Sequence, residues 1–175
     1  VSMTVKSEVL DLTSNGHRVT FHNVTDQVKQ FVTASGVQNG ICVVQSPHTT
    51  CSVIFEEFTH DRDFNGDEYL LVGMSRQLDK LVPRELTENT NYKYPGPKHI
   101  DFLHSIQDNP AYKGDDGTVL NGDAHIRASM FGASETFVIR DGEIQTGSVG
   151  SIYFVDWDQN RVRTRHCNVL VQGEA

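Results

Sequence analysis

Apolar and polar residues alternate over several short stretches of this 175-residue chain, and the alternation predicts strands near both ends. Ser14-Asn15-Gly16 separates the first two predicted strands, and Asp141-Gly142 is a dipeptide that favours a tight hairpin. The final pair, 152–156 with 162–171, is predicted to form a second hairpin. The predicted strands cover residues 3–12, 18–24, 40–45, 49–55, 136–140, 143–145, 152–156 and 162–171.

Helical spacing of apolar residues appears in two longer stretches. Thr25 and Asp26 offer helix caps, and that helix is expected to end at Gly36. The longest helix is predicted over 69–82, where Pro83 stops it. Residues 84–120 are polar and proline-containing without strong periodicity, which favours a long functional or mobile loop.

A third, short helix is predicted between the turn residues at 121–123 and Gly132. Ile126 and Met130 share one face of it and are expected to face the core, while His125 and Ser129 share the polar face. The order of elements favours a single α+β domain over 1–175, with an antiparallel sheet core and two main helices.

Composition narrows the classes of partner. A formal net charge of −8 argues against a general nucleic-acid partner but leaves small phosphorylated ligands open. No apolar run approaches the length of a membrane span, and Val1-Ser-Met-Thr-Val-Lys lacks the shape of a signal peptide. The three cysteines are scattered without zinc-ribbon spacing, so reduced thiols and a cytoplasmic location are expected.

Histidines supply the main candidate chemistry. His125, Arg127 and Ser129 lie on the short central helix, whose free N-terminus would favour an anion or a metal. His48 and His99 also lie near turn signals, and with His125 they could hold zinc or another divalent ion. His104 is a fourth possibility, and none of the four has the local spacing of a known metal helix.

Two charged groups have competing interpretations. Arg161, Arg163 and Arg165 alternate and could grip phosphate, but cross-strand pairs of Asp158 with Arg161 and of Asp156 with Arg163 are favoured. The acids at 56–67 could bind magnesium or act as a base, although a solvated loop is the preferred interpretation for most of them. Motifs for serine hydrolysis, phosphate-binding loops and dinucleotide binding are missing from the sequence.

Three segments together resemble the YjbQ family, also called UPF0047 or the secondary thiamine-phosphate synthase family. They are Ser46-Pro-His-Thr-Thr-Cys-Ser-Val-Ile-Phe-Glu-Glu57, Asn121-Gly-Asp-Ala-His-Ile-Arg-Ala-Ser129 and the stretch from Ser134 to Ile152. One departure is clear, because Gly147-Ser-Val-Gly150 stands where the family usually has Gly-Thr-Trp-Gln. A pocket wall that depends on the aromatic ring and the amide is therefore in doubt.

The resemblance implies a β-sandwich-like α+β fold, assembly as a homotrimer and a histidine pocket for a metal or phosphate. It also implies an activity that joins a pyrimidine diphosphate to a thiazole phosphate, expected to be weak here because Val149 and Gly150 replace Trp and Gln. The leading hypothesis is a metal-assisted transferase for phosphorylated small molecules. The alternatives are a non-catalytic metal- or phosphometabolite-binding protein and a metal-dependent hydrolase.

In the leading hypothesis His48, His99 and His125 hold a divalent ion, zinc or magnesium. Phosphate oxygens would be held by a second set of side chains, namely Thr49, Thr50, Arg127 and Ser129. Glu57, at the family-like acidic turn, would orient a ligand histidine or accept a proton, alongside His125 and Arg127 in catalysis.

Overall fold

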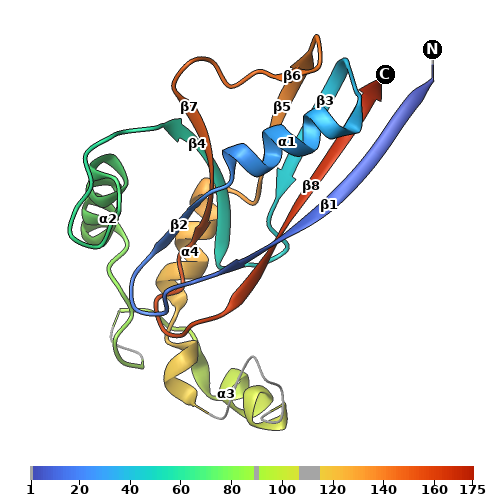
Figure 1. Cartoon of the computed structure of the whole chain (residues 1–175). Helices are drawn as coiled ribbons and strands as arrows, with labels where there is room; N and C mark the ends of the chain where they lie inside the picture. Colours follow the sequence, from blue (N-terminus) through green and yellow to red (C-terminus); the bar gives the residue numbers. More distant parts are fainter. Residues whose placement is uncertain (1, 89–90, 107–114) are drawn as a thin grey trace.

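Two antiparallel sheets form the frame of the protein in a computed structural model that describes residues 2–88, 91–106 and 115–175 (Figure 1). The first sheet has the strand order β1-β8-β3-β5-β6 and the second β2-β7-β4. The strands of the first sheet are β1 (Met3–Thr13), β8 (Thr164–Glu174), β3 (Asn39–Gln45), β5 (Ser134–Arg140) and β6 (Glu143–Ile144). Those of the second are β2 (Thr20–Asn23), β7 (Gly150–Asp156) and β4 (Cys51–Glu57).

The helix α1 (Thr25–Ser35) packs across both sheets and encloses the first hydrophobic core with them (Figure 1). Its valines Val28 and Val32 are buried, and Gly36 ends it in a left-handed conformation with φ of 78°. Strand residues at alternate positions complete this core, including Cys42, Val53 and Phe154.

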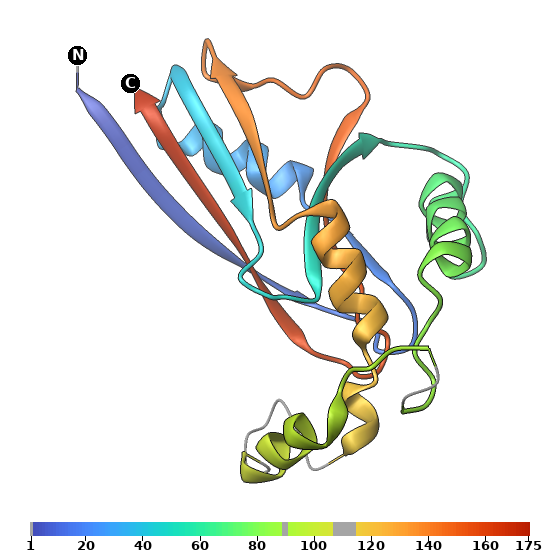
Figure 2. The ribbon, with the colours of Figure 1, turned by 180° about the vertical axis from the view of Figure 1, so that it is seen from behind.

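The opposite face of the second sheet carries the second core. Ile54, Tyr153 and Val155 alternate along their strands with residues of the first core, so their side chains lie on the opposite face of the sheet. They pack against α2 (Tyr69–Leu81) and α4 (Gly122–Phe131), and α4 lies in front of the sheet in Figure 2. Trp157 is fully buried there, with its ring 5.1 Å from that of Phe131.

The outer face of the five-stranded sheet carries apolar side chains among polar ones and stays uncovered by the described parts of the chain. Its exposed large apolar side chains come from β1, β3 and β5, and they include Val5 at 60%, Ile41 at 40% and Val138 at 51% of full exposure, whereas β8 contributes polar ones. The second sheet differs, because it carries packing on both of its faces.

The helices α3 (Gly96–Ser105) and η1 (Asp116–Val119) lie below the sheets in Figure 1, within the segment predicted as a loop. The loop prediction was wrong for these residues because a proline fits the first turn of a helix, where Pro97 lies. Leu103 and Val119 join the two elements in a small apolar cluster.

The α+β class with an antiparallel core is confirmed, as is the β5–β6 hairpin, whose Asp141 and Gly142 both have positive φ. The second predicted hairpin was wrong, because β7 and β8 belong to different sheets. The prediction that Ile126 and Met130 face the core was also wrong, since they are 42% and 51% exposed. The core-facing side of α4 instead carries Ala124, Arg127 and Ala128. Among the described helices, none has the length and apolar character needed to cross a membrane.

Replacing Phe154 by alanine should lower the free energy of unfolding by about 3–5 kcal/mol, because the ring is fully buried between α1 and the strands. Phe64→Ala is the matched control, since that ring is 96% exposed and its loss should change stability by about 0.5 kcal/mol or less. Chemical denaturation measures both values. Equal losses in the two variants would contradict this account of the core.

Candidate anion-binding site

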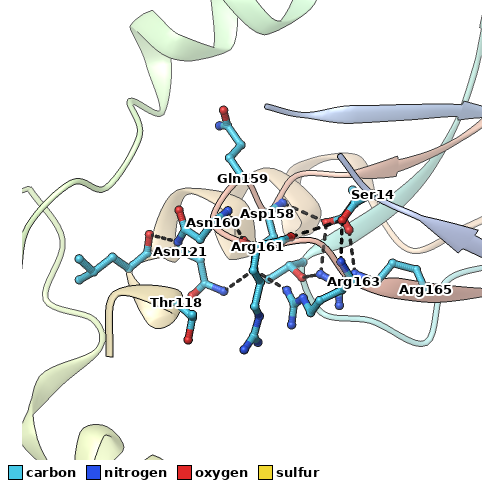
Figure 3. Close-up of polar contacts among 12 residues, drawn as sticks. Ser14, Thr118, Asn121, Asp158, Gln159, Asn160, Arg161, Arg163 and Arg165 are labelled. Carbon is cyan, nitrogen blue, oxygen red and sulfur yellow. Dashed lines mark hydrogen bonds and ion pairs between the residues drawn. The ribbon is translucent and has the colours of Figure 1, made fainter. Parts of the chain in front are cut away.

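The candidate site forms where the chain leaves the second sheet and enters the first. The connection between β7 and β8 carries Asp158, Arg161 and Arg163 and lies against the start of α4 (Figure 3). Asn121 Nδ2 donates to Asp158 Oδ2 at 3.0 Å, and the Asn160 side chain donates to the Leu120 carbonyl at 2.8 Å. These contacts hold the loop on the N-terminus of the helix.

Three alternating arginines differ in how completely they are paired. Arg165 is buried, and its Nε and Nη2 donate to Asp156 at 2.8 and 3.2 Å. Arg163 forms an ion pair with Asp158, and its Nε has no acceptor among the described residues. The predicted pairs of Asp158 with Arg161 and of Asp156 with Arg163 were therefore wrong. Each aspartate pairs instead with the next arginine in the alternating series, because β7 and β8 do not form a hairpin.

Of the three alternating arginines, Arg161 is the one that forms no ion pair with a described residue. Its Nε and Nη1 are enclosed and have no hydrogen-bond acceptor among the described residues. Burial, together with the neighbouring charge of Arg163, lowers the pKa of Arg161 to about 10, so the group stays charged at neutral pH. A half-buried guanidinium with unused donors is well suited to an anion.

Aromatic and imidazole rings form a wall next to these arginines. The Tyr94 ring lies 5.3 Å from that of His125 and 5.1 Å from that of His99, and Tyr94 Oη is 3.3 Å from His99 Nε2. An open hollow of about 350 Å³ lies here, lined by Tyr92, Lys93, Tyr94, Gly122, His125 and Ile126.

Electrostatic interactions connect the wall with the loop. Burial lowers the pKa of His125, Asp158 opposes that shift, and His99 and Arg163 add to it. The pKa of Tyr94 is raised mainly by burial, and Arg161 and Arg163 act against that rise. The imidazole of His125 is therefore mostly neutral at pH 7 and stands within the field of the arginines.

The predicted phosphate ligands are only partly brought together. His125 reaches the backbone of Thr49, so these two residues meet at the site. Thr50 is buried, and its hydroxyl accepts a hydrogen bond from Arg165 Nη2 at 2.8 Å. Ser129 is exposed and donates to the carbonyl of His125 at 3.0 Å, one helical turn back.

The structure does not bring His48, His99 and His125 together as three ligands around one position. Among residues 2–88, 91–106 and 115–175, no three His, Cys, Asp or Glu side chains are placed to hold an ion. His48 instead stacks on His166 with ring centroids 5.9 Å apart, and its Nε2 accepts the His166 amide at 2.8 Å. Tyr94 contacts both His99 and His125, and it is the neighbour that they share.

Arg127 and Glu57 lie away from the loop arginines. Arg127 is fully buried, and its Nη2 donates to Asp79 Oδ1 at 2.9 Å and to the Val82 carbonyl at 2.7 Å. Glu57 is exposed at the far end of β4, about 20 Å along the strand from Cys51. His104, the alternative to His99, pairs with Asp116 at 3.0 Å.

Two of the acids after β4 make structural contacts, one within its own loop and one with Arg18. Asp63 Oδ1 accepts the amides of Asn65 and Asp67 at 2.9 and 3.0 Å. Asp67 is paired with Arg18 at 2.7 Å.

Sequence reasoning missed Arg161, Tyr94 and Asn121 as residues of one site. The alternation of the arginines was visible, but the predicted hairpin assigned Arg161 a carboxylate partner that it lacks in the described structure. Tyr94 lies in the segment predicted to be a loop.

Fold and site together define an α+β protein of two antiparallel sheets with a cationic loop where the chain passes between them. The family model described as "UPF0047 protein YjbQ-like" matches residues 9–174, and the chain belongs to this family.

Relatives and solved structures agree with this assignment. A UPF0047 protein of Methanothermobacter thermautotrophicus is 26% identical over 99% of this chain and 96% of its own length. The UPF0047 protein YugU of Bacillus subtilis is 24% identical over 86% of this chain and 88% of its length. The crystal structure of a YbjQ-like protein of Sulfolobus solfataricus has a TM-score of 0.66 at 25% identity, covering 97% of this chain and 99% of that one.

His48 should make stability depend on pH on the acid side. Burial, followed by the charges of Arg165 and His166, lowers the pKa of His48 to about 4, below its unfolded value of about 6.5. His48 therefore contributes to the free energy of unfolding above about pH 6.5, and this contribution is lost as the pH falls toward about 4. His48→Gln, which keeps an acceptor for the His166 amide, should flatten that part of the profile.

Denaturation midpoints measured across this pH range test the expectation, with His60→Gln at an exposed position as the control. Parallel profiles for the wild type and His48→Gln would contradict it.

Proposed function

We propose that this protein binds a phosphorylated small molecule at the loop arginines. The observation that carries the proposal is the guanidinium of Arg161, which is half-buried, charged and without an acceptor among the described residues. Phosphate oxygens match the forked donors of arginine, and a phosphate would offset the repulsion between Arg161 and Arg163.

The neighbouring groups have distinct roles in this proposal. Arg163 divides its donors between Asp158 and the ligand, and His125, mostly neutral, accepts or donates one proton at the edge of the hollow. Zinc or magnesium would arrive with the ligand's phosphates, because the described side chains form no three-residue metal group. His99 supports Tyr94, and the backbone of Thr49 supports His125.

Group transfer is the chemistry that this arrangement would support. A diphosphate leaving group gains negative charge as its bond breaks, and two fixed guanidinium groups would stabilise that charge. The activity to test is the joining of a pyrimidine diphosphate to a thiazole phosphate, as the family resemblance implies.

A non-catalytic phosphometabolite-binding protein is the second candidate. Asp156 and Asp158 favour this candidate because both are buried and form ion pairs with Arg165 and Arg163. Neither carboxylate is therefore free to act as a base. Product formation from the two phosphorylated precursors, with zinc or magnesium added, separates the candidates. Ligand binding without product under every condition supports the binding protein.

Arg161→Gln should weaken the binding of inorganic pyrophosphate by about tenfold or more, because one charge-assisted contact contributes about 1.5–3 kcal/mol. Isothermal titration calorimetry at fixed ionic strength measures the affinity. The control is Arg140→Gln, which removes an exposed charge at the β5–β6 hairpin. Equal weakening in both variants would point to a general charge effect and contradict the site.

The proposal also includes assembly as a homotrimer. What supports association is the uncovered outer face of the five-stranded sheet, which exposes Val5, Ile41 and Val138 among polar neighbours. Such a face would bury its apolar area against further copies of the chain.

Ile41→Glu should therefore shift the protein toward the monomer, because it places a charge in the middle of that face. Leu81→Glu is the control, since Leu81 is exposed at the end of α2. Light scattering coupled to gel filtration gives the mass of each variant. A monomeric wild type at micromolar concentration would refute the assembly.

A further inference from the structure

The helix α4 begins without a side-chain cap of its own. Asn121 occupies the N-cap position, but its side chain bonds Asp158 and caps no helix amide. The amide of Gly122 is instead satisfied by Glu85, whose Oε2 accepts it at 2.6 Å. Asp123 completes the exchange, because its Oδ1 accepts the amide of Glu85 at 3.2 Å. Each carboxyl group thus accepts a backbone amide from the other's segment, which resembles a capping box formed across distant segments.

Both carboxyl groups are removed from water. Glu85 is 1% and Asp123 3% exposed, and Glu85 Oε1 has no donor among the described residues. Burial is the main reason that the pKa of each carboxyl group is raised. The charge of Asp123 adds to the rise at Glu85, whereas backbone hydrogen bonds act against the rise at both groups, and Arg127 and Arg84 act against it at Asp123. The charged and titratable groups around them come from α2, from the segment after it and from α4: they are Asp79, Arg84, Tyr92, Tyr94 and Arg127.

The cap also joins the two walls of the hollow. Tyr92 lies against Gly122, where an added Cβ would be 3.4 Å from its ring, and Tyr92 Oη donates to the Pro83 carbonyl. Tyr94 follows two residues later, and His125 follows Gly122 by three. The ring contact between Tyr94 and His125 therefore depends on how firmly this segment is held to α4.

We propose that Glu85 and Asp123 form a proton-linked clasp that positions Tyr94 beside His125 while one of the two carboxyl groups is protonated, and that loosens when both are ionised. Two ionised carboxylates in a buried place repel each other, and neither has a described guanidinium bonded to it. The functional consequence rests on the proposed anion site: the hollow is closed more firmly in mildly acidic solution, where pyrophosphate binding is then stronger.

The sign of the pH dependence follows from the raised pKa values. A carboxyl group that is harder to ionise in the folded protein than in the unfolded chain costs stability once the pH exceeds its unfolded pKa. The loss continues until the pH passes its folded pKa and then stays constant. The clasp should therefore weaken as the pH rises above about 4.5, the ordinary pKa of the Glu85 carboxyl.

Hydrogen exchange at the first turn of α4, measured by mass spectrometry from about pH 5 to about pH 8, tests the clasp directly. In the wild type the protection of these amides, corrected for intrinsic exchange, should fall by up to about tenfold per pH unit between the unfolded and the folded pKa of the protonated carboxyl group, and then level off. Glu85→Gln keeps an oxygen for the Gly122 amide but cannot ionise, so its protection should stay constant. Glu85→Ala should lose protection at every pH.

Glu8→Gln, an exposed change on β1, is the matched control and should follow the wild type. A Glu85→Gln profile that falls like the wild-type profile overturns the clasp, even if Glu85→Ala does not fold. Pyrophosphate affinity, measured for the same variants, tests the anion site separately from the clasp. Constant protection in Glu85→Gln, with no pyrophosphate bound by any variant, would refute the anion site and leave the clasp standing.

Discussion

The passage of the chain from one sheet to the other depends on two buried ion pairs. Asp156 ends β7 in the second sheet, and Arg165 lies at the start of β8 in the first. Their pairing, with that of Asp158 and Arg163, joins the end of β7 to the connecting loop and to the start of β8. Removing one partner from such a pair leaves a buried charge uncompensated, a loss of about 3–5 kcal/mol. The same loop then carries Arg161, so the site is built on the connection that joins the two cores.

Much of the fold could be predicted from the sequence because local patterns determine it. The Asp141-Gly142 turn, the valine spacing of α1 and the position of Pro83 each act over a few residues, and all three predictions were confirmed. Strand pairing is not local in this way. Nothing within 152–171 indicates that β7 and β8 diverge, because partners of both strands come from distant parts of the chain.

The site was harder to predict for the same reason. Arg127 is of a residue type that commonly binds anions, and it lies near a helix N-terminus. Tertiary packing nevertheless directs its side chain toward Asp79 and the core. Its burial explains why Ile126 and Met130 lie outward, since they occupy other faces of the same turns. The cap from Glu85 could not be seen in the sequence either, because 37 residues separate it from Gly122.

The ladder between β1 and β8 has a consequence for how the protein forms. Met3 pairs with Glu174 and Thr13 with Thr164, so the first strand of the chain is bonded to the last along its whole length. During synthesis β1 has no partner until β8 has left the ribosome, and β3 lacks one of its two neighbours for as long. Closing a loop of this length before any contact is gained slows folding. The five-stranded sheet therefore completes only after translation of β8, while α1 and the β5–β6 hairpin can form earlier.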